Sequence, residues 1–442
     1  MNYKVGMISL GCPKNQVDAE HLLAMLEESG CSIVDYVDGC DVVIINTCGF
    51  IDEAKQEAIE NILDAVELKN DGLIKKIIVT GCLAQRHQHE IMQEMPEVDA
   101  VIGIGANAEL LDIIEKVMKT DEKVEEFPDR SLLPLEGQRL LTTPEHWAYL
   151  KIADGCSNRC TYCTIPYIRG NMRSRKTENI IEEAKQLAEQ GVKEIVVVAQ
   201  DTTSYGLDLY GELKLPELLN ELCKIDGIEW IRLLYCYPDR ITDELIETIK
   251  NQPKVLNYID LPLQHANDRI LKSMNRRGNC ADIKNVISKL RAEIPDVVIR
   301  TTFIVGFPGE GEEEFEDLAV FVNEMNFDRL GCFAFSPQEG TPAYEMENQV
   351  DDEVKQHRGE IIMQDQYSIV EEKNNEKIGK TYRTVIEEYD SYTDSYTGRT
   401  YMDAPEIDGN VKFTGEGEYD IGDFVDVKIF DFDGYDLIGE IV

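Results

Sequence analysis

Three cysteines lie close together in the middle of the chain, Cys156, Cys160 and Cys163, in a C-x-x-x-C-x-x-C run. Thiolates grouped on one short segment are typical ligands of iron–sulfur clusters, and a 4Fe–4S cluster has four ligand positions. Three protein ligands leave one iron free to bind the amine and carboxylate of a cofactor. A zinc site usually has two ligand pairs, and no second C-x-x-C or any H-x-x-x-H occurs in the sequence. The run therefore predicts an iron–sulfur cluster, with zinc binding and chance clustering as the alternatives.

A second set of cysteines is spread along the first hundred residues. Cys12, Cys48 and Cys82 each follow an apolar run that we expect to be a β-strand. The carboxyl ends of parallel strands meet at one edge of a sheet, so three strand-terminal cysteines can converge on one point. Cysteine is also commonly buried as a small apolar residue, and the pattern alone leaves the two interpretations equally weighted.

The other six cysteines share no such position. We expect a structural role for Cys31, Cys40, Cys223, Cys236, Cys280 and Cys332.

The elements that must position the second set lie between residues 1 and 125. Short apolar runs alternate there with amphipathic stretches, which is typical of βαβ units and predicts a parallel αβα domain. The expected strands are Val5–Leu10, Asp41–Asn46, Ile77–Thr80 and Ala100–Gly103, and the clearest helices are Val17–Glu28 and Asp52–Leu68. Residues 126–144 hold Pro128, Pro134 and Pro144 without a clear period, and we interpret them as a linker.

The first cysteine set lies in a second α/β region, residues 145–377. Six strand-like runs are each followed by a helical stretch, of which Glu178–Gln190, ending before Gly191, is the clearest. This order predicts a (βα) barrel of about six units, open or complete, with its chemistry at the C-terminal ends of the strands. The expected strands are Ala148–Ile152, Glu194–Ala199, Trp230–Tyr235, Val255–Leu261, Val297–Val305 and Arg329–Phe335.

Several polar residues lie at or near the ends of these strands. Gln200 and Asp201 follow the second strand, Gln264 and His265 follow the fourth, and Arg300 lies in the fifth. Each is a candidate for the barrel mouth, and each could equally satisfy a structural hydrogen bond. We take Gln200 and Arg300 as candidate cofactor contacts. His265 could be a base, but a single histidine is more often structural, and no catalytic residue is assigned beyond the cluster ligands.

Residues 378–442 change to short alternating strands separated by Gly and Asp turns, which predicts a small all-β barrel or sandwich. This segment has 16 acidic and 5 basic residues, so its excess of negative charge is about twice as dense as in the rest of the chain.

The whole chain of 442 residues has 85 Asp and Glu against 44 Lys and Arg, a formal charge of -41. Such acidity argues against binding to nucleic acids or anionic membranes, which depends on clustered basic residues, and favours a basic partner. No apolar stretch is long enough to span a membrane, and no signal peptide precedes Cys12. We therefore expect a cytoplasmic protein, in which cysteines stay reduced.

The first cysteine set, placed in a βα barrel, resembles the cluster loop of the radical S-adenosylmethionine (SAM) enzymes. The sequence around both sets is similar to the methylthiotransferases of that superfamily over nearly the whole chain, including a C-terminal domain like the TRAM fold. The motifs that carry the resemblance are Leu10-Gly-Cys-Pro-Lys-Asn15, Asn46-Thr-Cys-Gly-Phe-Ile51, Thr80-Gly-Cys82, Thr164-Ile-Pro-Tyr-Ile-Arg-Gly170, Arg173-Ser-Arg175, Asp260-Leu-Pro-Leu-Gln-His265 and Gly306-Phe-Pro-Gly-Glu310.

The resemblance implies that C–H is replaced by C–S–CH3, with two 4Fe–4S clusters and SAM as cofactors. Cys156, Cys160 and Cys163 would hold the cluster whose open iron binds SAM, which is cleaved to methionine and a 5′-deoxyadenosyl radical by an electron from a reductant protein. Cys12, Cys48 and Cys82 would hold an auxiliary cluster that is methylated on sulfur by another SAM. A radical is needed because an unactivated carbon cannot be attacked by a nucleophile.

The family divides between enzymes for adenosine in tRNA and enzymes for an aspartate of a ribosomal protein. Pro13-Lys14 and Gly49-Phe50-Ile51 resemble the ribosomal-protein branch, and the acidic tail would attract a basic protein but repel phosphates. We expect β-methylthiolation of an aspartate in small-subunit ribosomal protein twelve. The alternatives are a tRNA adenosine methylthiotransferase and a non-catalytic iron–sulfur electron carrier or scaffold.

Overall fold

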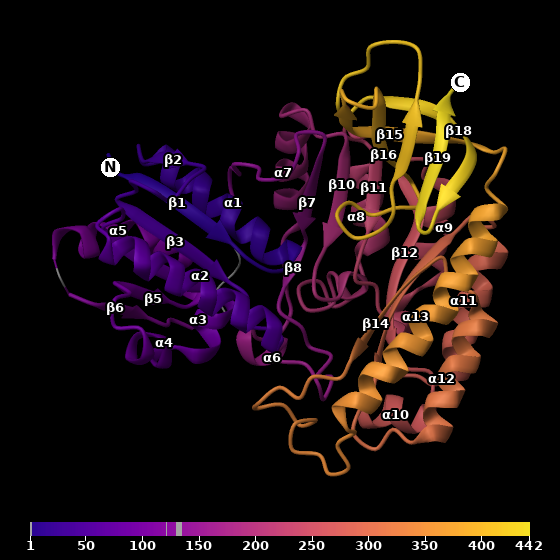
Figure 1. The fold of residues 1–442 in the computed structure, drawn as a ribbon, viewed down its shortest axis with the longest axis horizontal. Coiled ribbons are helices and arrows are strands. Elements are labelled where there is room, and N and C mark those ends of the chain that lie inside the picture. Colours follow the sequence, from indigo (N-terminus) through magenta and orange to yellow (C-terminus); the bar gives the residue numbers. More distant parts are fainter. Residues whose placement is uncertain (1, 121, 130–134) are drawn as a thin grey trace.

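Two parallel sheets and one closed β-barrel follow one another along the chain (Figure 1). The computed structural model describes residues 2–120, 122–129 and 135–442. The predicted α/β fold with a small C-terminal all-β barrel is confirmed.

The N-terminal sheet has six parallel strands in the order β2-β1-β3-β4-β5-β6, with helices packed on both faces. All four predicted strands are present, while the three-residue strands β2 and β6 are too short to give a periodic signal. The elements are β1 (Lys4–Ser9), α1 (Pro13–Glu28), β2 (Ser32–Val34), β3 (Val42–Thr47), α2 (Asp52–Asn70), β4 (Lys76–Gly81), α3 (Cys82–His87), α4 (His89–Glu94), β5 (Ala100–Ile102), η1 (Ile104–Glu109), α5 (Leu110–Lys119) and β6 (Val124–Glu126).

The central sheet also has six parallel strands, in the order β14-β13-β12-β11-β10-β7. All six predicted strands are present, and β7 and β14 form the two edges, so this is an open barrel with helices on its outer face (Figure 1). The elements are β7 (Trp147–Lys151), α7 (Thr177–Glu189), β10 (Glu194–Val198), η2 (Thr202–Ser204), α8 (Leu215–Leu222), β11 (Trp230–Leu233), η3 (Pro238–Arg240), α9 (Asp243–Asn251), β12 (Val255–Gln264), α10 (Asp268–Ser273), α11 (Cys280–Glu293), β13 (Val298–Val305), α12 (Glu312–Met325) and β14 (Arg329–Ala334).

Between β7 and α7 the chain makes an excursion that contains the first cysteine set. Two short strands, β8 (Ala153–Asp154) and β9 (Arg173–Ser174), pair antiparallel and close this excursion, and α6 (Ile165–Ile168) lies within it. A strand of two residues has no periodic pattern in the sequence, so the pairing of β8 with β9 was not predicted.

The C-terminal strands form a closed barrel in the order β15-β16-β17-β19-β18, after the long helix α13 (Asp352–Asn375). The helical stretch expected after the sixth strand is α13, whereas β16 was not predicted. No helix within the described ranges is long and apolar enough to cross a membrane. The strands are β15 (Thr381–Asp390), β16 (Ser395–Thr400), β17 (Val411–Thr414), β18 (Phe424–Asp433) and β19 (Asp436–Ile441).

The C-terminal barrel covers the inner face of the open central barrel near the N-terminal ends of its strands. Trp147, Tyr149 and Tyr258 from the central strands share one buried cluster with Val385 and Met402. The Tyr258 hydroxyl donates to Asp408 Oδ2 at 2.6 Å, and Arg329 pairs with Asp403. The C-terminal ends of the central strands are thus left for the cysteine loop.

Buried ion pairs join the N-terminal domain to the central barrel through α1. Arg139, from the predicted linker, pairs with Glu20 of α1 and with Glu183 of α7, the latter at 2.7 Å. Its side chain is 1% exposed, so this part of the linker is packed in the interface. Pro134 lies outside the described residues.

His21 of α1 makes the stability of this interface sensitive to pH. Its Nδ1 donates to Gln138 O at 3.2 Å, whereas its buried Nε2 has no partner among the described atoms. Burial lowers the pKa of His21 to about 4, and the charges of Arg139, Lys151 and Arg175 add to this effect against the opposing charge of Glu183.

We expect stability to fall by about 3 kcal/mol as the pH falls from 6.5 to 4, because the unfolded chain binds a proton that folded His21 rejects. Chemical unfolding of wild type and His21→Gln across this range will measure the effect. The variant should lose less stability than wild type, and parallel losses in both proteins would contradict the assignment.

Candidate functional site

The first cysteine set lies on a tight loop between β8 and α6. Gly155 has φ +72°, and a Cβ there would lie 2.3 Å from Asn171 O, so a larger residue would clash with the returning chain. Cys156 N donates to Gly170 O at 3.1 Å, and Cys163 N donates to Cys160 O at 3.1 Å. These contacts fold the loop so that its three cysteines lie on one short turn.

Residues at the C-terminal ends of the barrel strands hold this loop in place. Asn158 donates to Asp201 Oδ2 at 2.7 Å, and Arg240 pairs with the same carboxylate at 2.6 Å. Asp201 also accepts from Ser204 N and so caps η2. The predicted strand-end residue Asp201 is therefore a positioning residue for the cysteine loop.

The second cysteine set gathers at the carboxyl edge of β1, β3 and β4, which are neighbours in the N-terminal sheet. Cys12 caps α1, Cys48 follows β3, and Cys82 begins α3. Gly11 has φ +97°, and a Cβ there would lie 2.7 Å from Cys48 Cβ, so only glycine lets these two strand ends approach. The structure thus brings these three residues together.

Electrostatic coupling shows how close the members of each set are. Burial raises the pKa of Cys82 to about 12, and the charges of Cys12 and Cys48 raise it further against that of Arg169. Burial likewise raises the pKa of Cys156 to about 11, with a further contribution from Cys160. The pKa of Cys163 is raised by burial and by the charges of Cys160 and Cys156.

Cys12 differs from the other thiols of its set. Burial opposes ionisation, but the nearby charges of Lys14 and Arg169 and the backbone amides of Asn15 and Lys14 outweigh it, so the pKa of Cys12 is lowered. Anionic sulfur is the form that binds metal, and this end of α1 stabilises it.

The two cysteine sets supply the type of ligand, thiolate sulfur, that iron–sulfur clusters require. Within the described chain, no three His, Cys, Asp or Glu side chains are grouped tightly enough to hold a single metal ion. The cysteines of a 4Fe–4S cluster each bind a different iron, so their sulfurs lie farther apart than the ligands of one ion. Each set supplies three thiols, which are the donors that iron–sulfur clusters take from a protein.

Arg169 connects the second cysteine set to β8, the strand that leads into the loop of the first set, and it was not singled out in the sequence. It follows α6 and is 1% exposed, and it pairs with Asp18 of α1 at 2.9 Å and with Asp154 of β8 at 3.0 Å. Its charge also acts on Cys12 and Cys82. In the sequence, Arg169 appears only as part of the motif ending in Arg169-Gly170. That motif does not indicate that Arg169 pairs with a residue of the N-terminal domain.

Gln200 is placed as a ligand-binding side chain would be. It follows β10, and both polar atoms of its amide are buried without a hydrogen-bond partner among the described residues. Buried amide groups are rarely left unsatisfied, and an orphaned amide at a strand end points to a missing ligand.

The other polar candidates already have partners or strained backbone. Arg300 Nη1 pairs with Asp260 at 2.9 Å, and its Nε lies 3.5 Å from Asp408 of the C-terminal domain. Gln264 has φ +74°, in the left-handed region that is unusual for this residue type. His265 is fully buried, accepts from Asn267 N and donates through Nε2 to Glu310, so its role is structural.

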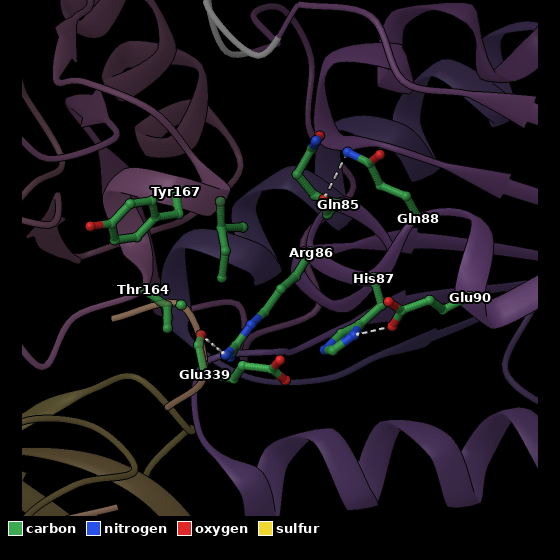
Figure 2. A pocket seen from close by; sticks show the side chains of 10 residues that line it. Gln85, Arg86, His87, Gln88, Glu90, Thr164, Tyr167 and Glu339 are labelled. Carbon is green, nitrogen blue, oxygen red and sulfur yellow. Dashed lines mark hydrogen bonds and ion pairs between the residues drawn. The ribbon is translucent and has the colours of Figure 1, made fainter. Parts of the chain in front are cut away.

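A cavity of about 340 Å³ lies between α3 and α6, next to both cysteine sets. Figure 2 shows Arg86 reaching from α3 toward Glu339, with Thr164 and Tyr167 opposite. The hydroxyl of Thr164, the residue after Cys163, is buried without a partner in the described structure. The cavity therefore gives a polar approach to the region between the two domains.

Three families match consecutive parts of the chain. The Radical SAM superfamily matches residues 150–322, the family described as "Uncharacterized protein family UPF0004" matches residues 4–103, and the TRAM domain matches residues 378–442. The radical SAM fold implies a 4Fe–4S cluster and SAM as cofactors.

Solved structures share the fold at low identity. TsrM from Kitasatospora setae, a radical SAM methyltransferase with cobalamin and a [4Fe-4S] cluster bound, has a TM-score of 0.59 at 13% identity, over 78% of this chain and 77% of that one. The cobalamin-dependent radical SAM enzyme OxsB has a TM-score of 0.53 at 13% identity, over 83% and 58%.

Curated relatives match over the full length. Two proteins named ribosomal protein uS12 methylthiotransferase RimO are similar to the chain: the one from Caldanaerobacter subterraneus is 53% identical over 99% of both chains, and the one from Acetivibrio thermocellus is 50% identical over 100% of this chain and 99% of the relative. The chain thus belongs to the RimO family of radical SAM methylthiotransferases.

Proposed function

We propose that this enzyme replaces a hydrogen on the β-carbon of one aspartate of ribosomal protein uS12 by a methylthio group. The observation that carries the proposal is the pair of three-cysteine sets, with the buried Arg169 between α1 of the N-terminal domain and β8 at the mouth of the central barrel. The full-length similarity to relatives of that name supports the choice of substrate.

We assign two 4Fe–4S clusters to the two sets. Cys156, Cys160 and Cys163 hold the cluster that binds SAM, and Cys12, Cys48 and Cys82 hold the auxiliary cluster. The orphaned amide of Gln200 is the first proposed contact to SAM. Arg300 is the second, since its side chain is still 19% exposed despite its pairing with Asp260.

The reaction balances with two molecules of SAM. The clusters and SAM supply, when bound, a hydrogen-abstracting radical and a methylated sulfur. The substrate C–H, one hydrosulfide and two SAM give C–S–CH3, S-adenosylhomocysteine, methionine, 5′-deoxyadenosine and a proton. One electron from a reductant protein starts the cleavage of SAM, and one electron is returned when the carbon bonds to sulfur.

The protein's own residues keep the two sites in a fixed relation. Asp201 and Arg240 fasten the loop of the first set, and Arg169 and Arg139 fasten α1, which begins at the second set, to the barrel. A carbon placed between the sets could then lose its hydrogen on one side and meet sulfur on the other.

The acidic C-terminal domain, residues 378–442, supports a basic protein partner. Eleven of its acidic side chains and four of its basic side chains are exposed. Three further carboxylates, those of Glu387, Asp403 and Asp408, form ion pairs with arginines. Such a surface attracts and steers a lysine- and arginine-rich protein and repels phosphates. We propose residues 1–125 and 145–377 as the other two domains. We also propose that the enzyme acts in the cytoplasm, where ribosomal proteins reside.

Mass measurement after incubation with SAM and dithionite tests the proposal. Reconstituted enzyme should add to uS12 the mass of one methylthio group in exchange for hydrogen, on a peptide containing the target aspartate. Purified tRNA in a parallel reaction should stay unmodified. If tRNA were modified and uS12 were not, the proposed substrate would be wrong. If no 5′-deoxyadenosine formed with either substrate, the protein would instead be an electron carrier.

A further inference from the structure

Lys14 is a buried lysine at the boundary between the two domains. It lies in the first turn of α1, two residues after Cys12, and is 5% exposed. Its Nζ lies 3.3 Å from the centroid of the Tyr235 ring, which belongs to the central barrel. The ammonium group therefore crosses from the N-terminal domain to the barrel mouth.

No Asp or Glu pairs with this ammonium group, and the acidic group that its charge acts on is the Cys12 thiol. The first turn of α1 contains no acidic residue, and no ion pair involves Lys14 in the described parts of the chain. The carboxylate one turn further along α1, that of Asp18, already pairs with Lys151 and Arg169. In a protein with 85 acidic residues, a buried lysine without a carboxylate partner is unusual.

Tyr235 is held rigidly for this contact. It follows β11 with φ +60°, a left-handed conformation that is strained for tyrosine, and its N donates to Asp260 Oδ2 at 2.9 Å. Its carbonyl accepts from Thr202 N at 3.0 Å. Strained residues fixed by their surroundings occur often at ligand sites. The ring attracts a cation but cannot neutralise its charge.

The same strand end reaches both cysteine sets. Tyr235 contacts Lys14 beside Cys12, and two residues later the Tyr237 hydroxyl lies 3.9 Å from Cys160 Sγ. Gln200, with its orphaned amide, follows the neighbouring strand β10. Lys14 thus points to the place where a substrate carbon would meet both sites.

We propose that Lys14 binds the side-chain carboxylate of the substrate aspartate, with the Tyr235 ring holding the ammonium group in position. This inference rests on the proposed function. The carboxylate is bonded directly to the β-carbon, so fixing it fixes the hydrogen that is removed. Lys14 is in this sense a specificity residue, since the adenine base of a tRNA substrate offers no carboxylate.

The test compares two forms of uS12, one with the target Asp and one with Asn in its place. Dissociation constants are measured with full-length reconstituted enzyme in the presence of S-adenosylhomocysteine, which cannot turn over. Wild type should bind the Asp form about 30-fold more tightly, the loss expected when one partner of a buried charge pair is removed.

In Lys14→Met the preference should fall to about 1, while Lys14→Arg should keep part of it. Tyr235→Phe, which keeps the ring, should behave as wild type and serves as the matched control for Tyr235→Leu, in which the preference should drop. The iron content of each variant should equal that of wild type.

Three results would overturn the inference: a preference that survives in Lys14→Met, no preference in wild type, or loss of iron in Lys14→Met, which would make Lys14 a support of the cysteine set instead. Failure of the proposed function looks different, because wild type would then modify tRNA and leave uS12 unchanged.

Discussion

Replacing Cys12, Cys48 and Cys82 together by alanine should abolish methylthiolation while the enzyme still cleaves SAM. The first cysteine set and its supports, Asp201 and Arg240, lie on the central barrel and do not depend on these thiols. The iron content should fall from about eight to about four per chain, since one 4Fe–4S cluster is lost. Product mass, 5′-deoxyadenosine and iron are measured on the same preparation.

Cys31→Ala with Cys40→Ala is the matched control for this triple variant. Both thiols are buried in the same N-terminal domain, at 6% and 2% exposure, but they precede β2 and β3 and so lie at the N-terminal ends of strands, whereas Cys12, Cys48 and Cys82 follow the carboxyl ends. The control should keep about eight irons and full activity. Loss of both SAM cleavage and sulfur insertion in the triple variant would show that the roles of the two sets are wrongly assigned.

Replacing Arg169 by methionine should have the largest effect on stability. The change leaves the buried carboxylates of Asp18 and Asp154 without this partner, and breaking a buried ion pair costs about 3–5 kcal/mol. It also removes a positive charge from Cys12 and Cys82. We expect a lower unfolding midpoint, loss of auxiliary-cluster iron, and little or no methylthiolation.

Arg139→Met separates these two effects. Arg139 is equally buried in the same interface and also pairs with two carboxylates, Glu20 and Glu183, but no cysteine lies among its partners. It should lower the unfolding midpoint by a comparable amount and keep its iron. If Arg169→Met lost stability but retained all its iron, the charge of Arg169 would have no part in cluster binding.

The strands of both sheets were predictable because each buried strand is an apolar run of its own. β3 and β10 are buried at every position, so their signal needs no partner to be recognised. A helix was expected after the sixth strand, but the bounds of α13 were not predictable because its buried residues include Lys355, Arg358 and Gln366, whose polar character hides the packed face. Their burial depends on contacts such as Arg358 with Glu310, 48 residues earlier.

The two cysteine sets also differ in how far local sequence predicts them. The spacing of Cys156, Cys160 and Cys163 indicated a cluster because three ligands on one short loop are a local feature. Cys12, Cys48 and Cys82 remained ambiguous without the family resemblance, since their proximity requires β1, β3 and β4 to be neighbours and Gly11 to allow close approach.

By itself the sequence determined the kind of chemistry, the order of the domains and the acidity of the tail, all of which depend on residue type and local spacing. Only the tertiary structure decided what buried charges do. Arg169 interacts with two carboxylates and two thiols, and Asp201 holds the cysteine loop. His265 is hydrogen-bonded to Glu310, and Lys14 has no carboxylate partner. A buried polar group must find its partner wherever the fold brings one, and Arg169 and Asp18, for example, lie 151 residues apart along the chain.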